Sequence, residues 1–124
     1  MRLMLLEHVN LTVADLDRSI AFYCDLLELH VRWKGPIDDR RIGAHVGDER
    51  HYLALFQATA NGTVDHDYLR PGVNHFGFVV DDLDDARERA TRLGATVHLE
   101  AEYEPGRRIY FLDPDGHEVE LVEY

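Results

Sequence analysis

Apolar and polar residues alternate in short runs along this chain, beginning near its first histidine. Between residues 8 and 13, Val9, Leu11 and Val13 alternate with polar side chains. A period of two predicts a strand with one buried face, because successive side chains point to opposite sides. The alternation therefore places His8 and Asn10 on the face away from the core.

A helix is predicted directly after this strand. Asp15 stands at a position suited to an N-cap, where a carboxylate accepts hydrogen bonds from free backbone N–H groups. The following apolar residues recur at helical spacing, and the predicted buried stripe comprises Leu16, Ile20, Tyr23, Cys24 and Leu27. Three short strands follow, at roughly residues 30–34, 41–47 and 51–57.

The same order of patterns then occurs a second time. A shift of 67 positions places His8 on His75, Leu11 on Phe78, and the Asp-Leu-Asp run at residue 15 on that at residue 82. Asp82 is the expected N-cap of the second helix and Gly94 its C-terminal stop. The predicted stripe comprises Leu83, Ala86, Ala90 and Leu93, and strands follow at roughly residues 96–100, 107–113 and 117–124. An internal repeat of this length indicates two copies of one supersecondary unit.

These elements predict an α+β fold made of two βαβββ modules, with curved mixed sheets and the helices on the outside. The modules are expected at residues 1–57 and 73–124, joined by a polar, Gly- and Pro-containing linker at residues 58–72. Together they form one domain of 124 residues, and a 45% hydrophobic content suffices for its core.

Charge and cysteine content exclude several classes of function. The chain has 24 acidic and 13 basic residues, which disfavours binding to nucleic acid or to anionic membranes. The single cysteine, Cys24, excludes an intrachain disulfide framework and fits a reducing compartment. The opening apolar run is too short for a signal peptide, and no stretch is long enough to span a bilayer, so a cytoplasmic protein is expected.

Three candidate metal-binding residues fall on the predicted free faces of the sheets. In the last strand, Val119 and Leu121 alternate with Glu120, so the carboxylate lies away from the helix. If the two sheets curl toward each other, His8, His75 and Glu120 converge. Two imidazoles and one carboxylate suit a divalent transition metal with open positions, and zinc accepts similar ligands.

Other polar residues near these candidates have simpler interpretations. Glu118 and Glu123 are expected to be solvated strand residues, because the repeat assigns them no role. Tyr110 either packs beneath the cavity or contacts a substrate. Arg107 and Arg108 either hold an anionic group of a substrate or lie in solvent.

The runs "EHVNLTVADLDRSIAFY", "VNHFGFVVDDLDDA" and "IYFLDPDGHEVEL" resemble the vicinal oxygen chelate superfamily. Its members include glyoxalase I, type I extradiol dioxygenases, fosfomycin-resistance enzymes and metal-free bleomycin-binding proteins. The resemblance implies that His8, His75 and Glu120 are the metal ligands. It also implies catalytic roles for Glu120 and for Tyr110, whose counterpart in extradiol dioxygenases lies beside the substrate.

The chain lacks residues that are typical of two of these enzyme classes. Glyoxalase I-like enzymes carry a second glutamate where this chain has Ala54, and extradiol dioxygenases carry a histidine upstream of the last strand that is missing here. His98 lies too far back in the chain to match that histidine. The resemblance implies dioxygenase-type or lyase/isomerase-type chemistry on a small substrate chelated through vicinal oxygens. The alternative is a non-catalytic, drug-sequestering protein of the bleomycin-resistance type.

The resemblance also implies a cofactor and a partner. The cofactor is a divalent metal ion, with Fe2+, Mn2+, Zn2+, Ni2+ and Co2+ all left open by the ligand set. The partner is a second copy of the chain, since proteins of this kind are typically homodimers. In such a dimer, His8 of one subunit could meet His75 and Glu120 of the other.

Overall fold

The computed structural model describes residues 2–103 and 105–124, which fold into two compact units, Met1–Asn61 and Gly62–Tyr124. The first unit contains β1 (His8–Val13), α1 (Leu16–Leu27), β2 (His30–Pro36), β3 (Ile42–Gly47) and β4 (Tyr52–Gln57). The second contains β5 (Phe76–Val79), α2 (Leu83–Arg92), β6 (Thr96–Tyr103), β7 (Gly106–Leu112) and β8 (Glu118–Glu123).

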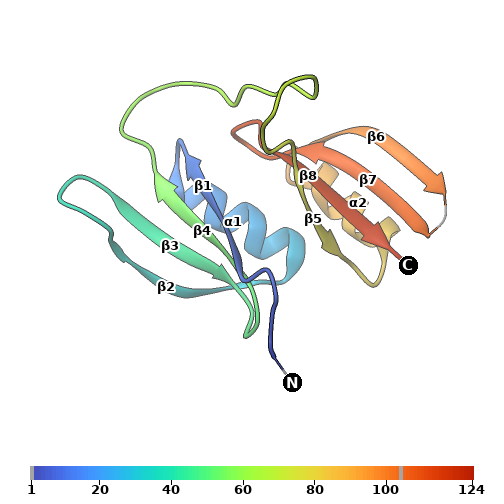
Figure 1. Ribbon diagram of the computed structural model, residues 1–124, viewed down its shortest axis with the longest axis horizontal. Helices are drawn as coiled ribbons and strands as arrows, with labels where there is room; N and C mark the ends of the chain where they lie inside the picture. Colours follow the sequence, from blue (N-terminus) through green and yellow to red (C-terminus); the bar gives the residue numbers. More distant parts are fainter. Residues whose placement is uncertain (1, 104) are drawn as a thin grey trace. The chain divides into compact units, whose positions relative to one another are not determined.

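Each unit is a four-stranded mixed sheet with a helix packed on one face (Figure 1). The strand order is β1-β4-β3-β2 in the first unit and β5-β8-β7-β6 in the second. In both, the first and last strands pair in parallel and the remaining neighbours pair antiparallel. The predicted α+β fold of two βαβββ modules is therefore confirmed.

Both helices begin at the predicted caps. The Asp15 side chain accepts a hydrogen bond from Arg18 N at 3.1 Å, and the Asp82 side chain accepts one from Asp85 N at 3.0 Å. After α2, Gly94 takes a φ of +87°, a left-handed conformation that glycine adopts without strain. The sequence signals for helix starts were thus sufficient here.

The buried stripe of α1 was predicted only in part. Its buried residues are Leu16, Ser19, Phe22, Tyr23 and Leu26. Ile20, Cys24 and Leu27 are only half-buried. The helix is apolar over more than half of its circumference, so the spacing alone does not decide which apolar residues face the sheet.

The stripe of α2 was predicted more accurately. Leu83, Ala86 and Ala90 are buried as expected. Leu93 is 36% exposed, because α2 ends at Arg92 and Leu93 caps it outside the packed face. Small alanines on this face let the helix approach its sheet closely.

Alternation along the strands separates a buried face from an open face in each unit. On the helix side, Leu11 and Leu55 are buried in the first unit, and Phe111 and Leu121 in the second. Residues 58–72, all of them described, form no helix or strand. Of the helices in the described part of the chain, none has the length and apolar character needed to cross a membrane.

Candidate metal centre

The open face of the second unit brings two of the predicted ligands together. His75 lies directly before β5, and Glu120 lies in β8, the strand paired in parallel with β5. His75 Nε2 is 3.3 Å from Glu120 Oε2. Two donors bound at adjacent positions of an octahedral ion, each at about 2.1 Å, lie about 3 Å apart. Their separation therefore fits a shared divalent cation.

The second oxygen of Glu120 is held by two donors from β7. Arg108 Nη1 donates to Glu120 Oε1 at 3.0 Å, and Tyr110 Oη donates to the same oxygen at 3.1 Å. The side chains of Arg108 and Glu120 are both only 13% exposed, so this pairing is largely removed from solvent. The carboxylate is therefore anchored through Oε1 and presents Oε2 toward His75.

His75 is held in a similar way through its other ring nitrogen. The Tyr68 hydroxyl lies 3.0 Å from His75 Nδ1, and Glu118 Oε1 lies 3.5 Å from it. The imidazole also makes a T-shaped contact with the Tyr110 ring, with centroids 5.3 Å apart. Each of the two candidate ligands thus has one atom anchored and one atom turned toward the other.

The sequence pattern predicts a solvated Glu118, and this prediction is wrong. Its side chain is only 12% exposed. Oε1 accepts a hydrogen bond from the Tyr68 hydroxyl, and Oε2 lies 2.9 Å from His98 Nε2. Burial raises the pKa of Glu118, but hydrogen bonds from Tyr68 and His98 outweigh burial, so the pKa lies below its ordinary value.

Tyr68 and His98 were not identified as site residues from the sequence. Tyr68 falls in the segment interpreted as a linker, where nothing in the local pattern points to a role. The hydrogen bond to Glu118 raises the pKa of Tyr68 to about 12, so its hydroxyl is protonated at neutral pH. His98 lies between Val97 and Leu99, where the register of β6 with β7 shifts, and such a bulge turns a side chain out of simple alternation.

Glu123 was also expected to be solvated, and it too has a structural role. Its Oε2 accepts a hydrogen bond from Leu83 N at 2.8 Å, which satisfies a free N–H group in the first turn of α2. Arg107 pairs with Asp84 at 2.9 Å and lies 3.8 Å from Glu123 Oε1. These contacts tie α2 to the sheet.

His8, the third predicted ligand, lies on β1 of the first unit. Its Nδ1 is 2.9 Å from Glu7 Oε1, its ring stacks on Tyr52 with centroids 5.0 Å apart, and its side chain is 46% exposed. The hydrogen bond with His8 lowers the pKa of Glu7. His8 thus resembles His75 in having Nδ1 engaged, and its convergence with His75 and Glu120 stays a prediction.

The open face of the first unit is otherwise aromatic. His45 stacks on Tyr52 with centroids 4.4 Å apart, Trp33 lies 5.1 Å from His45, and the Arg32 guanidinium lies 4.6 Å above the Tyr52 ring. Burial lowers the pKa of His45, and the charges of Arg32 and His8 lower it further. This face therefore favours a neutral imidazole at His45.

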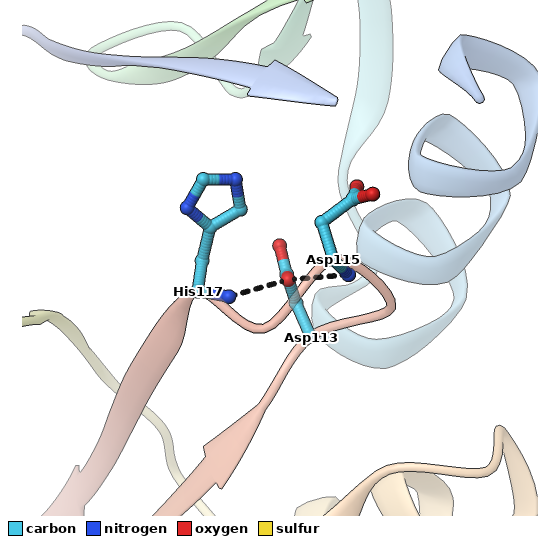
Figure 2. Close-up of side chains that lie close together, drawn as sticks. All are labelled: Asp113, Asp115 and His117. Carbon is cyan, nitrogen blue, oxygen red and sulfur yellow. Dashed lines mark hydrogen bonds between the residues drawn. The ribbon is translucent and has the colours of Figure 1, made fainter. Parts of the chain in front are cut away.

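A third group of metal-binding residue types lies in the turn between β7 and β8. Atoms of Asp113, Asp115 and His117 lie within 4.8 Å of one another (Figure 2). Asp113, however, uses Oδ1 to accept from Asp115 N and His117 N, both at 2.9 Å. Asp48 accepts from Arg50 N and His51 N in the corresponding turn of the first unit. The repeated arrangement indicates a turn cap.

Comparison with known proteins agrees with this fold. The model of the Glyoxalase/Bleomycin resistance protein/Dioxygenase superfamily matches residues 5–121. The glutathione transferase FosA of Serratia marcescens is 32% identical, over 94% of this chain and 78% of the relative. The lactoylglutathione lyase of Salmonella typhimurium is 33% identical, over 97% of this chain and 93% of the relative.

Solved structures share the architecture. A glyoxylase/bleomycin resistance protein/dioxygenase domain from Frankia sp. EAN1pec superposes with a TM-score of 0.81 at 29% identity, covering 98% of each chain. The fosfomycin resistance protein FosX of Listeria monocytogenes gives a TM-score of 0.76 at 22% identity, covering 99% of this chain and 95% of FosX. A FosX variant has been solved with Mn(II) and 1S,2S-dihydroxypropylphosphonic acid. The family model matches nearly the whole chain, and the fold agrees with it. The chain therefore belongs to the glyoxalase/bleomycin resistance protein/dioxygenase superfamily.

Proposed function

We propose that this protein is a metal-dependent enzyme in which His8, His75 and Glu120 hold a divalent ion. The observation that carries the proposal is the pair of anchored ligands in the second unit. His75 Nε2 and Glu120 Oε2 face each other at 3.3 Å, while Nδ1 and Oε1 are engaged elsewhere. An arrangement that leaves one donor of each side chain for a common partner is typical of a prepared metal site.

The residues around the site have separate tasks in this proposal. A bound ion supplies Lewis-acid activation of a small substrate that chelates it through vicinal oxygens. Arg108 offsets the charge of Glu120 and fixes Oε1 at 3.0 Å. Tyr110 donates to Glu120 and packs against His75, so it acts on the ligands directly, and its contact with substrate is part of the proposal.

Among the reactions of the superfamily, we favour addition of a nucleophile to a small electrophile. The relatives named above are a glutathione transferase and a lactoylglutathione lyase, which point to thiol-linked substrates. Isomerisation moves a proton between substrate carbons and benefits from a second carboxylate, whereas this chain has Ala54 at that position. Addition of a thiol forms a C–S bond as a C–O bond of the electrophile breaks. The thiol proton passes to the released oxygen, so no proton moves between carbons.

The proposal is tested by metal titration of protein purified without a histidine tag. Glu120→Ala and His75→Ala should each lower Mn2+ affinity by more than about 100-fold, because loss of a ligand exceeds the effect of losing an outer contact. Asp115→Ala is the matched control, since it removes a carboxylate from the turn and leaves the sheet face intact. Glutathione transfer to fosfomycin and formation of lactoylglutathione are then assayed on the metal-loaded protein.

Two outcomes contradict the proposal. Wild-type protein that takes up no stoichiometric Mn2+, Fe2+, Zn2+, Ni2+ or Co2+ excludes a metal-dependent enzyme. Metal binding that is lost in Asp115→Ala and retained in Glu120→Ala would place the metal site in the turn.

We also propose a homodimer with the site shared between subunits. Light scattering on the same samples should give twice the chain mass.

A further inference from the structure

We infer that Tyr68 and Glu118 are positioning residues that select the tautomer of His75, with the proton on Nδ1 and the lone pair on Nε2. The tautomer follows from contacts within the second unit and does not require a bound ion. Its consequence for metal affinity rests on the proposed function. A neutral imidazole coordinates a metal only through its unprotonated nitrogen, so the tautomer decides which atom can be a ligand.

The proton count on Tyr68 leads to this assignment. A tyrosine hydroxyl has a single proton, and here it is donated to Glu118 Oε1, which as a carboxylate oxygen can only accept. Toward His75 Nδ1, 3.0 Å away, the phenol oxygen can therefore only accept a hydrogen bond. Nδ1 must then carry the proton, and Nε2 is left with its lone pair.

Glu118 is itself held in place for this task. Its Oε2 lies 2.9 Å from His98 Nε2, and its side chain is largely buried. The carboxylate keeps Oε1 near both the Tyr68 hydroxyl and His75 Nδ1, the latter at 3.5 Å. Negative charge on this side of the ring also favours a proton on Nδ1 over one on Nε2.

Glu120 favours the other tautomer, with the proton on Nε2, because its Oε2 lies 3.3 Å from His75 Nε2. A proton on Nε2 would satisfy that oxygen but would leave the Tyr68 oxygen facing a nitrogen lone pair. Glu120 already receives two hydrogen bonds on Oε1, from Arg108 and Tyr110, which reduce its demand for a third donor. The balance therefore favours the proton on the Tyr68 side.

The inference gives the segment at residues 58–72 a role beyond joining the two units. Tyr68 reaches from this segment to His75 and Glu118. Two residues earlier, His66 Nε2 contacts Gly116 O at 2.6 Å, which ties the same segment to the turn between β7 and β8. His66 therefore offers a control that alters the segment and leaves the His75 contacts in place.

Long-range 1H–15N correlation NMR on the metal-free protein tests the inference, at a pH where the imidazole is neutral. The His75 signals are assigned by their loss in His75→Gln. Wild type should show the Nδ1–H tautomer, and Tyr68→Phe/Glu118→Ala should change to Nε2–H, because both acceptors near Nδ1 are gone. Tyr68→Phe alone, which keeps the ring and the fold, should lower Zn2+ affinity by about 10- to 100-fold.

Three outcomes overturn the inference: an Nε2–H tautomer in wild type, an Nδ1–H tautomer retained in a folded double variant, or the same change in His66→Ala. Failure of the proposed function is recognised separately. Protein that binds no Zn2+ but shows the Tyr68-dependent tautomer refutes the metal site alone. Protein that binds Zn2+ through His75 and Glu120 with the tautomer unchanged in the double variant refutes the inference alone.

Discussion

The open faces of the two units share the same strand pairing but carry different types of side chain. The register pairs His8 with Tyr52 on the first sheet, whereas His75 contacts Glu118 on the second. Ala54, beside Asn10, is the counterpart of Glu120, beside Gly77. One sheet therefore places an aromatic ring and a methyl group where the other places two carboxylates.

The difference extends across the inner strands. His45 pairs with Ala54 in the first unit, and Tyr110 pairs with Glu120 in the second. The register also shifts at equivalent places, and the residue at that point is Arg32 on β2 and His98 on β6. The first face thus gathers rings and a guanidinium, and the second gathers acids with their hydrogen-bond donors.

The two faces also differ at the position beside Ala54 or Glu120 on the neighbouring parallel strand, β1 or β5. In the first unit, Asn10 stands there, and its Nδ2 donates to Ala54 O at 2.8 Å. In the second, Gly77 stands there, and a Cβ added to it would lie 3.5 Å from Glu120 Oε2. A Cβ at this position would therefore be in ordinary van der Waals contact with the Glu120 carboxylate.

The buried faces of the two sheets, in contrast, are alike, because both carry closely packed apolar side chains. Packing of the core therefore constrains one face of each sheet, and the residues of the open face can differ between the units. Leu55 and Leu121 occupy equivalent positions, and both are fully buried. Their surroundings are closely packed, so both positions demand an apolar side chain of similar size. No such demand acts on the open faces.

The largest expected effect on stability comes from breaking these two matched core positions. Leu55→Ala and Leu121→Ala should each lower the free energy of unfolding by about 2–5 kcal/mol, because a buried cavity replaces the side chain. Urea denaturation measures the loss. Amide hydrogen exchange should accelerate mainly in the unit that carries the substitution, and an equal acceleration in both units would show that they do not open separately.

A smaller and more local effect is expected at the helix caps. Asp15→Ala and Asp82→Ala should each cost about 1 kcal/mol, since each removes the acceptor for a free N–H group at 3.0–3.1 Å. Asn at either position caps as well as Asp and serves as the matched control. Thermal unfolding followed by circular dichroism measures both pairs, and an Asn variant as unstable as the Ala variant would argue against capping.

The smallest expected effect concerns pH and the aromatic face. The pKa of His45 is lowered, so below about pH 6.5 the unfolded chain binds more protons than the folded chain. The free energy of unfolding should therefore fall as pH drops from the ordinary histidine pKa toward the lowered one. Between about pH 7.5 and pH 5.5, the free energy of unfolding should fall less in His45→Gln than in wild type. Parallel profiles for the two proteins would contradict this origin.

Much of this architecture could be predicted from local pattern. Alternation placed His75 and Glu120 on the open face, and Asp15 and Asp82 marked the helix starts. The stripe of α1 was partly wrong, because Phe22 and Leu26 compete with Ile20 and Leu27 on a largely apolar helix. Here periodicity gives two acceptable solutions, and packing against the sheet selects one.

By itself, the sequence determined the repeat, the βαβββ order and the side of each sheet on which the candidate ligands lie. Alternation and capping act over a few neighbouring residues, which is why they can be read from the chain. Only the tertiary structure decided that the Glu118 side chain is largely removed from solvent and that Tyr68, 50 residues away, donates to it. Such contacts depend on strand register and on a bulge at His98, and these are settled by the packing of distant segments.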